Sequence, residues 1–188
     1  MSTDEKILAI EKAIKKRSGG GRLDRWNTPS TVHTLTNSSP SEPEGFEYLD
    51  HTADVQVHAW GDSFLKALEM AVLSMFGYMT NLNLVKDDHD LSQNIAKQIK
   101  AQGHDKESLV FDFLDGWLFL FHDEGFVPNR VTIDSFNIDT FSIISSATGE
   151  KFDATKHTKG TEVKAITYSN MQIQETKKRC DIWVIIDI

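Results

Sequence analysis

The stretch DKESLVFDFLDGWLFLFH, residues 105 to 122, reads as one long helix whose apolar residues cover much of its circumference. The large apolar side chains recur at helical spacing, at Leu109, Val110, Phe113, Leu114, Trp117, Leu118 and Phe121. A helix with so wide an apolar surface must be covered on several sides. We therefore expect it to lie deep against a β-sheet.

A second helix is predicted upstream of this stretch. Its apolar residues also follow the helical period, at Leu65, Leu68, Val72 and Met75. Gly61-Asp62-Ser63 supplies a turn and a side-chain oxygen for the start of the helix, and Gly77 is expected to end it. Before the turn, apolar and polar residues alternate from Val55 to Trp60, which predicts a half-buried strand.

Downstream of Pro128 the apolar pattern changes to a period of two, which is typical of strands. Strands are predicted near residues 131–133 and 141–143, across 161–174 and along 181–188, with a turn at 148–149. Residues 87–104 are predicted to be a loop or a divergent strand. The order of elements indicates a single α+β domain over residues 45–188, with a mostly antiparallel sheet and two main helices packed on one face.

The first 44 residues differ in composition from this domain. Residues 18–44 begin with Ser-Gly-Gly-Gly and continue with Ser, Thr, Asn and Pro. Such a segment buries too little apolar surface to offset its ordering entropy, so we expect a flexible N-terminal extension over residues 1–44. Within it, Ile7, Ile10 and Ile14 share one helical face. They could form a short surface helix or a partner-docking motif.

Charge is divided unevenly between these two parts. Residues 1–44 carry seven Lys and Arg against six Asp and Glu, whereas residues 45–188 carry 13 against 22. An acidic surface repels a phosphate backbone, which disfavours unaided nucleic-acid binding and favours a cation site or a protein partner. The sequence has one cysteine and no apolar stretch that is long enough for a membrane span. We expect an intracellular protein, in the cytoplasm, the nucleus or both.

Two segments carry the oxygen ligands of a candidate metal site. Asp50-His51-Thr52-Ala53-Asp54 places two carboxylates and an imidazole just before a strand, although Asp and Thr are also common turn and cap residues. The C-terminal residues 183–188 are strongly apolar, and burial of this strand would hold the Asp187 side chain and the α-carboxylate of Ile188 at one place. If Asp54 also lies there, a cation is needed to offset the repulsion. Oxygen ligands favour Ca²⁺, Mg²⁺ or Mn²⁺ over zinc. Alternatively, Asp187 simply faces water.

A third segment, residues 156–168, has the sequence KHTKGTEVKAITY. His157 to Gly160 reads as a turn that leads into a strand. Lys164 in that strand could hold a phosphate or a partner carboxylate near an acidic site, or could simply be an exposed charge. The sequence has no G-x-S-x-G elbow, P-loop, H-E-x-x-H or C-x-x-C motif. Cys180 follows three basic residues, but its apolar neighbours indicate a structural thiol.

These segments together resemble the archease family. The resemblance rests on residues 48–55 (YLDHTADV), on 61–63, on the K-H-x-x-G-T-E-V-K-A-I-T-Y motif and on the terminal VIIDI, in matching order across residues 46–188. The resemblance implies that a divalent ion is held by Asp54, Asp187 and Ile188, with calcium as the leading candidate and Mn²⁺ or Mg²⁺ as alternatives. Asp50 falls where relatives carry Glu and is not assigned as a ligand.

The resemblance also implies a function. Archeases are non-catalytic accessory proteins of the RtcB-type tRNA-splicing RNA ligase, and they promote guanylylation of the ligase and its multiple turnover. This chain would then meet tRNA and GTP only through the ligase complex, with no part in a membrane. Two alternatives stay open. One is a metal-dependent hydrolase in which His51 or His157 acts as the base. The other is a metal-independent chaperone or interaction module.

Overall fold

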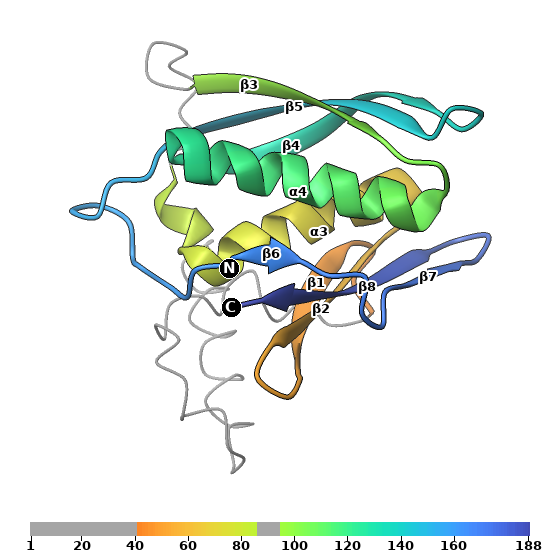
Figure 1. The fold of residues 1–188 in the computed structure, drawn as a ribbon, viewed down its shortest axis with the longest axis horizontal. Coiled ribbons are helices and arrows are strands. Elements are labelled where there is room, and N and C mark those ends of the chain that lie inside the picture. The colour runs from red at the N-terminus through yellow and green to blue at the C-terminus, as the bar shows by residue number, and fades with distance from the viewer. Residues whose placement is uncertain (1–40, 86–94) are drawn as a thin grey trace, which may run out of the picture.

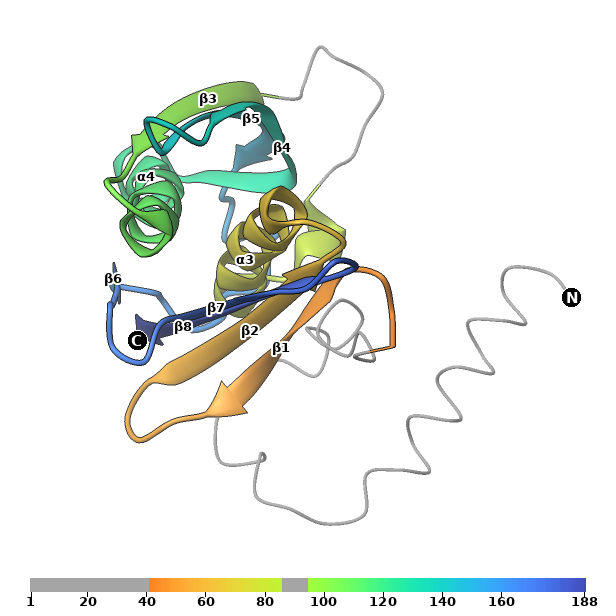
Figure 2. The same ribbon diagram turned by 90° about the vertical axis from the view of Figure 1, so that its right-hand side faces the viewer.

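The computed structural model describes residues 41–85 and 95–188, and their strands form two sheets with two helices between them (Figures 1 and 2). The five-stranded sheet contains β1 (Gly45–Asp50), β2 (Val55–Gly61), β6 (Ala165–Ile166), β7 (Gln172–Glu175) and β8 (Cys180–Asp187). The three-stranded sheet contains β3 (Ile95–Gln102), β4 (Phe126–Asn137) and β5 (Ser142–Lys151). The helices are α3 (Phe64–Met79), the short 3-10 helix η2 (Leu82–Leu84) and α4 (Lys106–Glu124).

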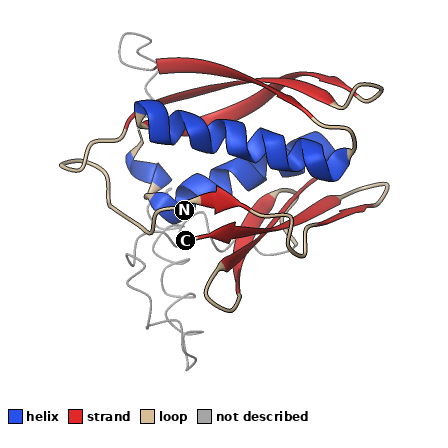
Figure 3. Cartoon of the chain, in the orientation of Figure 1, coloured by secondary structure: helices blue, strands red, loops and turns tan. Residues whose placement is uncertain are grey.

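The predicted α+β class is confirmed. Every strand pair within the described residues is antiparallel, and the two long helices are the ones that the sequence indicates (Figure 3). The structure adds that the strands divide between two sheets, each of which turns one face toward the helices. In the five-stranded sheet β8 is central, because it pairs with β2 on one side and with both β6 and β7 on the other.

Both helices begin at side-chain caps. The Ser63 hydroxyl accepts a hydrogen bond from the Lys66 backbone N–H, as predicted. Asp105 and Ser108 form a capping box at the start of α4. The prediction that Gly77 ends α3 is wrong, because the helix continues to Met79. Gly77 serves close packing instead, since a Cβ there would lie 3.1 Å from the hydroxyl oxygen of Tyr48 on β1.

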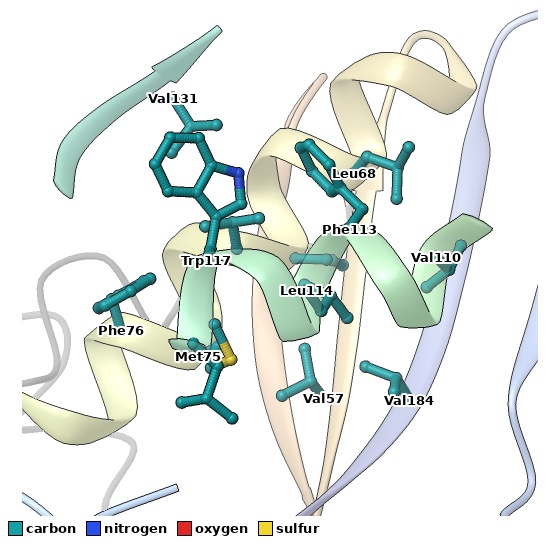
Figure 4. Packing of buried hydrophobic residues seen from close by; sticks show 14 of the residues in the cluster. Val57, Leu68, Met75, Phe76, Val110, Phe113, Leu114, Trp117, Val131 and Val184 are labelled. Atoms are coloured by element: carbon teal, nitrogen blue, oxygen red, sulfur yellow. The ribbon is translucent and has the colours of Figure 1, made fainter. Parts of the chain in front are cut away.

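Helix α4 lies in the middle of the core, as its apolar circumference predicts (Figure 4). Phe113, Leu114 and Trp117 are fully buried, and they pack among residues of α3 and of both sheets. Full burial of a side chain of this size contributes about 1.5–3 kcal/mol to folding. Most polar residues of the helix lie on its remaining, exposed side, together with Phe119.

Two predicted elements are wrong in part. Residues 161–174 are not one strand: only β6 and β7 are extended, and Asn170 between them adopts a left-handed backbone with φ 50°. Residues 148–149 are not a turn, because β5 continues to Lys151 and Gly149 pairs with both neighbouring strands. Part of 87–104 is the strand β3, and residues 86–94 are outside the described residues.

The N-terminal prediction falls almost wholly on residues 1–40, which are outside the described part of the chain. The predicted helical face of Ile7, Ile10 and Ile14 also lies outside the described residues. Among the helices of residues 41–85 and 95–188, none is long and apolar enough to cross a membrane.

Gly149 provides a direct test of this packing. A Cβ built there would lie 2.1 Å from the carbonyl oxygen of Val127, which is backbone and cannot move aside. We expect Gly149→Ala to lower the free energy of unfolding by at least about 1–3 kcal/mol in urea titrations. Gln98→Ala on the exposed side of β3 is the control and should change it by less than about 0.5 kcal/mol. Equal effects of the two substitutions would contradict the close approach.

Candidate metal centre

The end of β8 lies beside the start of β2. In their antiparallel register Val55 is opposite Ile186, so extending the ladder by one residue places Asp54 opposite Asp187. Val184 and Ile186 point into the core, which turns Asp187 and its neighbour Asp54 toward the face of the sheet away from the helices. Directly opposed like charges destabilise a strand pair. This pair of carboxylates is therefore suited to a cation.

The C-terminus is anchored on its other side by β6. Ala165 pairs with Asp187, and the Lys164 N–H donates to the Asp187 carbonyl at 2.9 Å. The side chain of Ile188 is half-buried and packs against the hydrophobic core. The side chain of the last residue is thus held by packing, and the C-terminus lies at this end of the sheet (Figure 1).

Asp54 closes the four-residue loop between β1 and β2. Ala53 immediately before it has a left-handed backbone with φ 71°, which reverses the chain as it enters β2. The Asp54 side chain is 31% exposed, and its Oδ2 lies 3.9 Å from His51 Nδ1. In Figure 2 this hairpin and the C-terminus lie on the same side of the molecule.

The donor set at this place consists of oxygens. No group of three or more His, Cys, Asp or Glu side chains within residues 41–85 and 95–188 is arranged to hold a metal ion. A site here therefore needs a third ligand that is not a side chain. The α-carboxylate of Ile188, next to Asp187 in the chain, is the candidate for this ligand. Three carboxylates fit a hard cation such as Ca²⁺, Mg²⁺ or Mn²⁺ better than zinc.

In the third candidate segment, residues 156–168, His157 has a structural role and Lys164 is exposed. His157 is buried: its Nδ1 accepts a hydrogen bond from the Asp153 N–H at 2.9 Å, and its Nε2 lies 3.1 Å from Glu150. This side chain fixes its own loop and is already engaged at both nitrogens. Lys164 is exposed and adjoins the residue that pairs with Asp187, so it lies at the same end of the sheet.

The outer face of the five-stranded sheet carries a charged network that the sequence analysis missed. His58 on β2 bridges Glu47 on β1 and Asp181 on β8, with its two ring nitrogens 2.9 Å from the two carboxylates. Arg179 makes two-pronged contacts with the same Asp181. Trp183 stacks on the His58 ring at 4.4 Å between centroids. Only the register of three strands brings these residues together, so no local motif could have revealed them.

This network predicts acid sensitivity. Burial would raise the pKa of the Asp181 carboxyl, but hydrogen bonds from Arg179 and His58 outweigh it and hold that pKa below its usual range. A lowered folded-state pKa stabilises the protein above the unfolded pKa of about 3.9, and the gain is lost as pH falls through the folded value. We expect Asp181→Asn to lower the free energy of unfolding by about 1–3 kcal/mol at neutral pH.

Urea titrations across pH would check this expectation. The difference between wild type and Asp181→Asn should begin to shrink below about pH 4, where the carboxyl of the unfolded chain takes up a proton, and should vanish as pH falls through the lower pKa of the folded state. Asp115→Asn, on the exposed side of α4, is the control and should have little effect at any pH. A difference that stays constant down to the most acidic sample would contradict the assignment.

Cys180 is the structural thiol that the sequence analysis predicts. It is buried at the start of β8, and burial, aided by the charge of Glu175, raises its pKa to about 12. The nearby basic residues therefore do not make it reactive.

Two antiparallel sheets around two long helices define a small α+β protein. The chain belongs to the archease family: the Archease protein family matches residues 46–188. The "Protein archease" of Ictalurus punctatus is 47% identical over 150 residues, covering 79% of this chain and 88% of the catfish protein.

More distant relatives share the same domain. "Protein archease" of Methanosarcina barkeri is 33% identical over 150 residues. The match covers 79% of this chain and 99% of the Methanosarcina protein. About a fifth of this chain therefore has no counterpart in that relative. The solution structure of Methanobacterium thermoautotrophicum protein 1598 is 31% identical with a TM-score of 0.59, covering 76% of this chain and 98% of that one. A Thermotoga maritima crystal structure, described as an archease and possible chaperone, shares the fold at 19% identity, with a TM-score of 0.52 and 74% and 94% coverage.

Proposed function

We propose that this protein is a non-catalytic accessory protein of an RtcB-type RNA ligase. It docks on the ligase, presents the end of the five-stranded sheet near the nucleotide site and promotes guanylylation, so that the ligase turns over many times. Asp54, Asp187 and the α-carboxylate of Ile188 would hold a divalent ion, with calcium the leading candidate. When bound, such an ion supplies positive charge for orienting phosphate or carboxylate oxygens.

The observation that supports this proposal is the shared register of β2 and β8 at the chain terminus. It brings two carboxylates that are more than 130 residues apart in sequence to neighbouring positions, and the side chain of the next residue, Ile188, packs on the core. The chain belongs to the archease family over residues 46–188, and the ligase is proposed as its partner from the function that the resemblance implies. Lys164, exposed at the same end, could contact a phosphate or a carboxylate of the complex.

The direct test measures guanylylation of the ligase. Purified RtcB-type ligase is incubated with labelled GTP and Mn²⁺, with and without this protein, and the covalent nucleotide adduct is followed over time. We expect faster adduct formation and repeated rounds of ligation when the protein is present. Identical time courses, with direct binding between the two proteins verified, would refute the proposal.

A chaperone role is the second candidate. The Thermotoga neighbour is described as a possible chaperone, and here Phe119 and Tyr168 are 63% and 55% exposed and could contact an apolar client. Suppression of aggregation of a heated client protein, measured by light scattering in EDTA and in Ca²⁺, separates the two functions. Suppression that is independent of the cation and is lost in Phe119→Ser would favour the chaperone role.

A further inference from the structure

The exposed side of α4 carries aromatic rings and carboxylates in a single row. Four of its residues follow one another at intervals of four positions, which places them along one stripe of the helix surface. This aromatic–acidic stripe consists of Phe111, Asp115, Phe119 and Asp123. Phe119 is 63% exposed, and the aspartate on either side of it in the stripe is exposed as well. At about 1.5 Å of rise per residue the stripe is about 18 Å long.

Tyr168 extends the stripe at its Phe111 end. This tyrosine follows β6, and its ring stacks on the Phe111 ring with 4.4 Å between the centroids and an angle of 3° between the planes. Phe111 packs against the core, whereas Tyr168 is 55% exposed. Two aromatic contact points, the Phe111–Tyr168 pair and Phe119, therefore lie about 12 Å apart along the helix. Aromatic side chains are among the residues that contribute most to protein–protein affinity.

The charges on α4 determine which partner suits these rings. The helix carries five Asp and Glu against one Lys. That lysine, Lys106, is at the start of the helix and forms an ion pair with Glu175. Within the described residues neither Asp115 nor Asp123 has an ion-pair partner. Two carboxylates are thus available to an incoming cationic group beside Phe119.

An arginine side chain matches this combination. Its guanidinium can pair with Asp115 or Asp123 while its plane stacks on the Phe119 ring. Nucleic acid and anionic lipid would be repelled, and a second copy of the chain, with a net charge of −8, would bring like charges together. The partner is therefore a protein with a basic surface. An enzyme that binds RNA carries such a surface, because its Lys and Arg residues neutralise the phosphates.

The C-terminal end of α4 lies next to the candidate metal centre. The His122 Nε2 atom is 3.1 Å from the carbonyl oxygen of Val163. The next residue, Lys164, donates its backbone N–H to the Asp187 carbonyl at 2.9 Å. Figure 1 shows α4 running alongside β6, which adjoins the final strand β8. One partner could therefore contact the stripe and the end of the sheet together.

We propose that the aromatic–acidic stripe, together with Tyr168, is a docking surface for an arginine-bearing segment of the ligase. This inference rests on the proposed function and adds to it a contact that is separate from the metal ligands. The stripe would supply affinity for the ligase through Phe119 and its two neighbouring carboxylates. The metal centre would supply the stimulation of guanylylation.

The affinity of the purified ligase for variants of the full-length chain tests this proposal. We expect Phe119→Ala to weaken binding at least about tenfold, as loss of an interface anchor does. Asp115→Lys combined with Asp123→Lys should weaken binding and make the affinity less sensitive to added salt. Ile138→Ala and Asp139→Lys, both exposed in the hairpin between β4 and β5, are the matched controls and should stay within about twofold of wild type.

Stimulation measured against protein concentration separates docking from the metal centre. Phe119→Ala should need about tenfold more protein for half of the maximal effect, whereas Asp187→Asn should fail at every concentration. If wild type binds the ligase and the stripe variants bind it equally well, the docking surface is refuted while the proposed function stands. Absence of binding by wild type would overturn both. Self-association of wild type that is lost in Phe119→Ala, measured by analytical ultracentrifugation, would assign the stripe to a second copy and overturn the proposal.

Discussion

Asp187→Asn is expected to remove the stimulation of the ligase and to weaken Ca²⁺ or Mn²⁺ binding by at least about 10–100-fold, the loss usual for groups that merely support a metal ligand. The substitution keeps the size of the side chain and deletes one of two facing negative charges. Asp54→Asn should have the same effect, because both carboxylates serve one ion. Multiple-turnover ligation and calorimetric titration of the cation would measure the two losses.

Thermal unfolding separates loss of the site from loss of the fold. In EDTA, Asp54→Asn and Asp187→Asn should be at least as stable as wild type, since each relieves repulsion between opposed carboxylates. Wild type alone should gain stability with added cation, because only a folded site binds it. Asp50→Asn, at the end of β1 in the same hairpin, is the matched control and should behave like wild type. Full stimulation by both site variants would exclude the proposed metal centre.

A few residues added after Ile188 are expected to reduce cation affinity by a similar factor and to impair ligase stimulation. The added peptide bond turns the α-carboxylate into an amide, which removes one of three charged ligands while Asp54 and Asp187 remain. The side chain of Ile188 can still pack on the core, so the protein should stay folded. An N-terminal addition of the same sequence leaves the α-carboxylate free and is the control.

Calorimetry of the two extended proteins compares them directly. A lower affinity only in the C-terminally extended form would assign the terminal carboxylate as a ligand. Equal affinities would mean that Asp54 and Asp187 bind the ion with water or with a group of the ligase, and that Ile188 only anchors the strand.

Local patterns were sufficient to predict much of this fold. The apolar circumference around Trp117 indicated a central helix, and the Ser63 cap and the period of two after Pro128 located further elements. The C-terminal apolar run predicted a buried final strand, which β8 confirms. The metal ligands came from the family resemblance and stay a prediction; the register of β2 and β8 leads only to neighbouring positions for Asp54 and Asp187.

Other features could not be predicted because they depend on partners distant in sequence. Gly77 and Gly149 resemble helix-stop and turn signals, yet both are required by close contacts with other strands. The left-handed Asn170 interrupts a segment whose alternation suggested one long strand. His58 shows no local sign of its two carboxylate partners, one of which is 123 residues away.

The central position of β8 has a consequence for biosynthesis. The strand on which β2, β6 and β7 all pair follows every other described strand in the chain, so the five-stranded sheet cannot form until β8 has been synthesised. A truncated chain that lacks β8 would leave β2, β6 and β7 without their common partner strand. Unpaired strand edges of this kind expose the chain to aggregation and proteolysis.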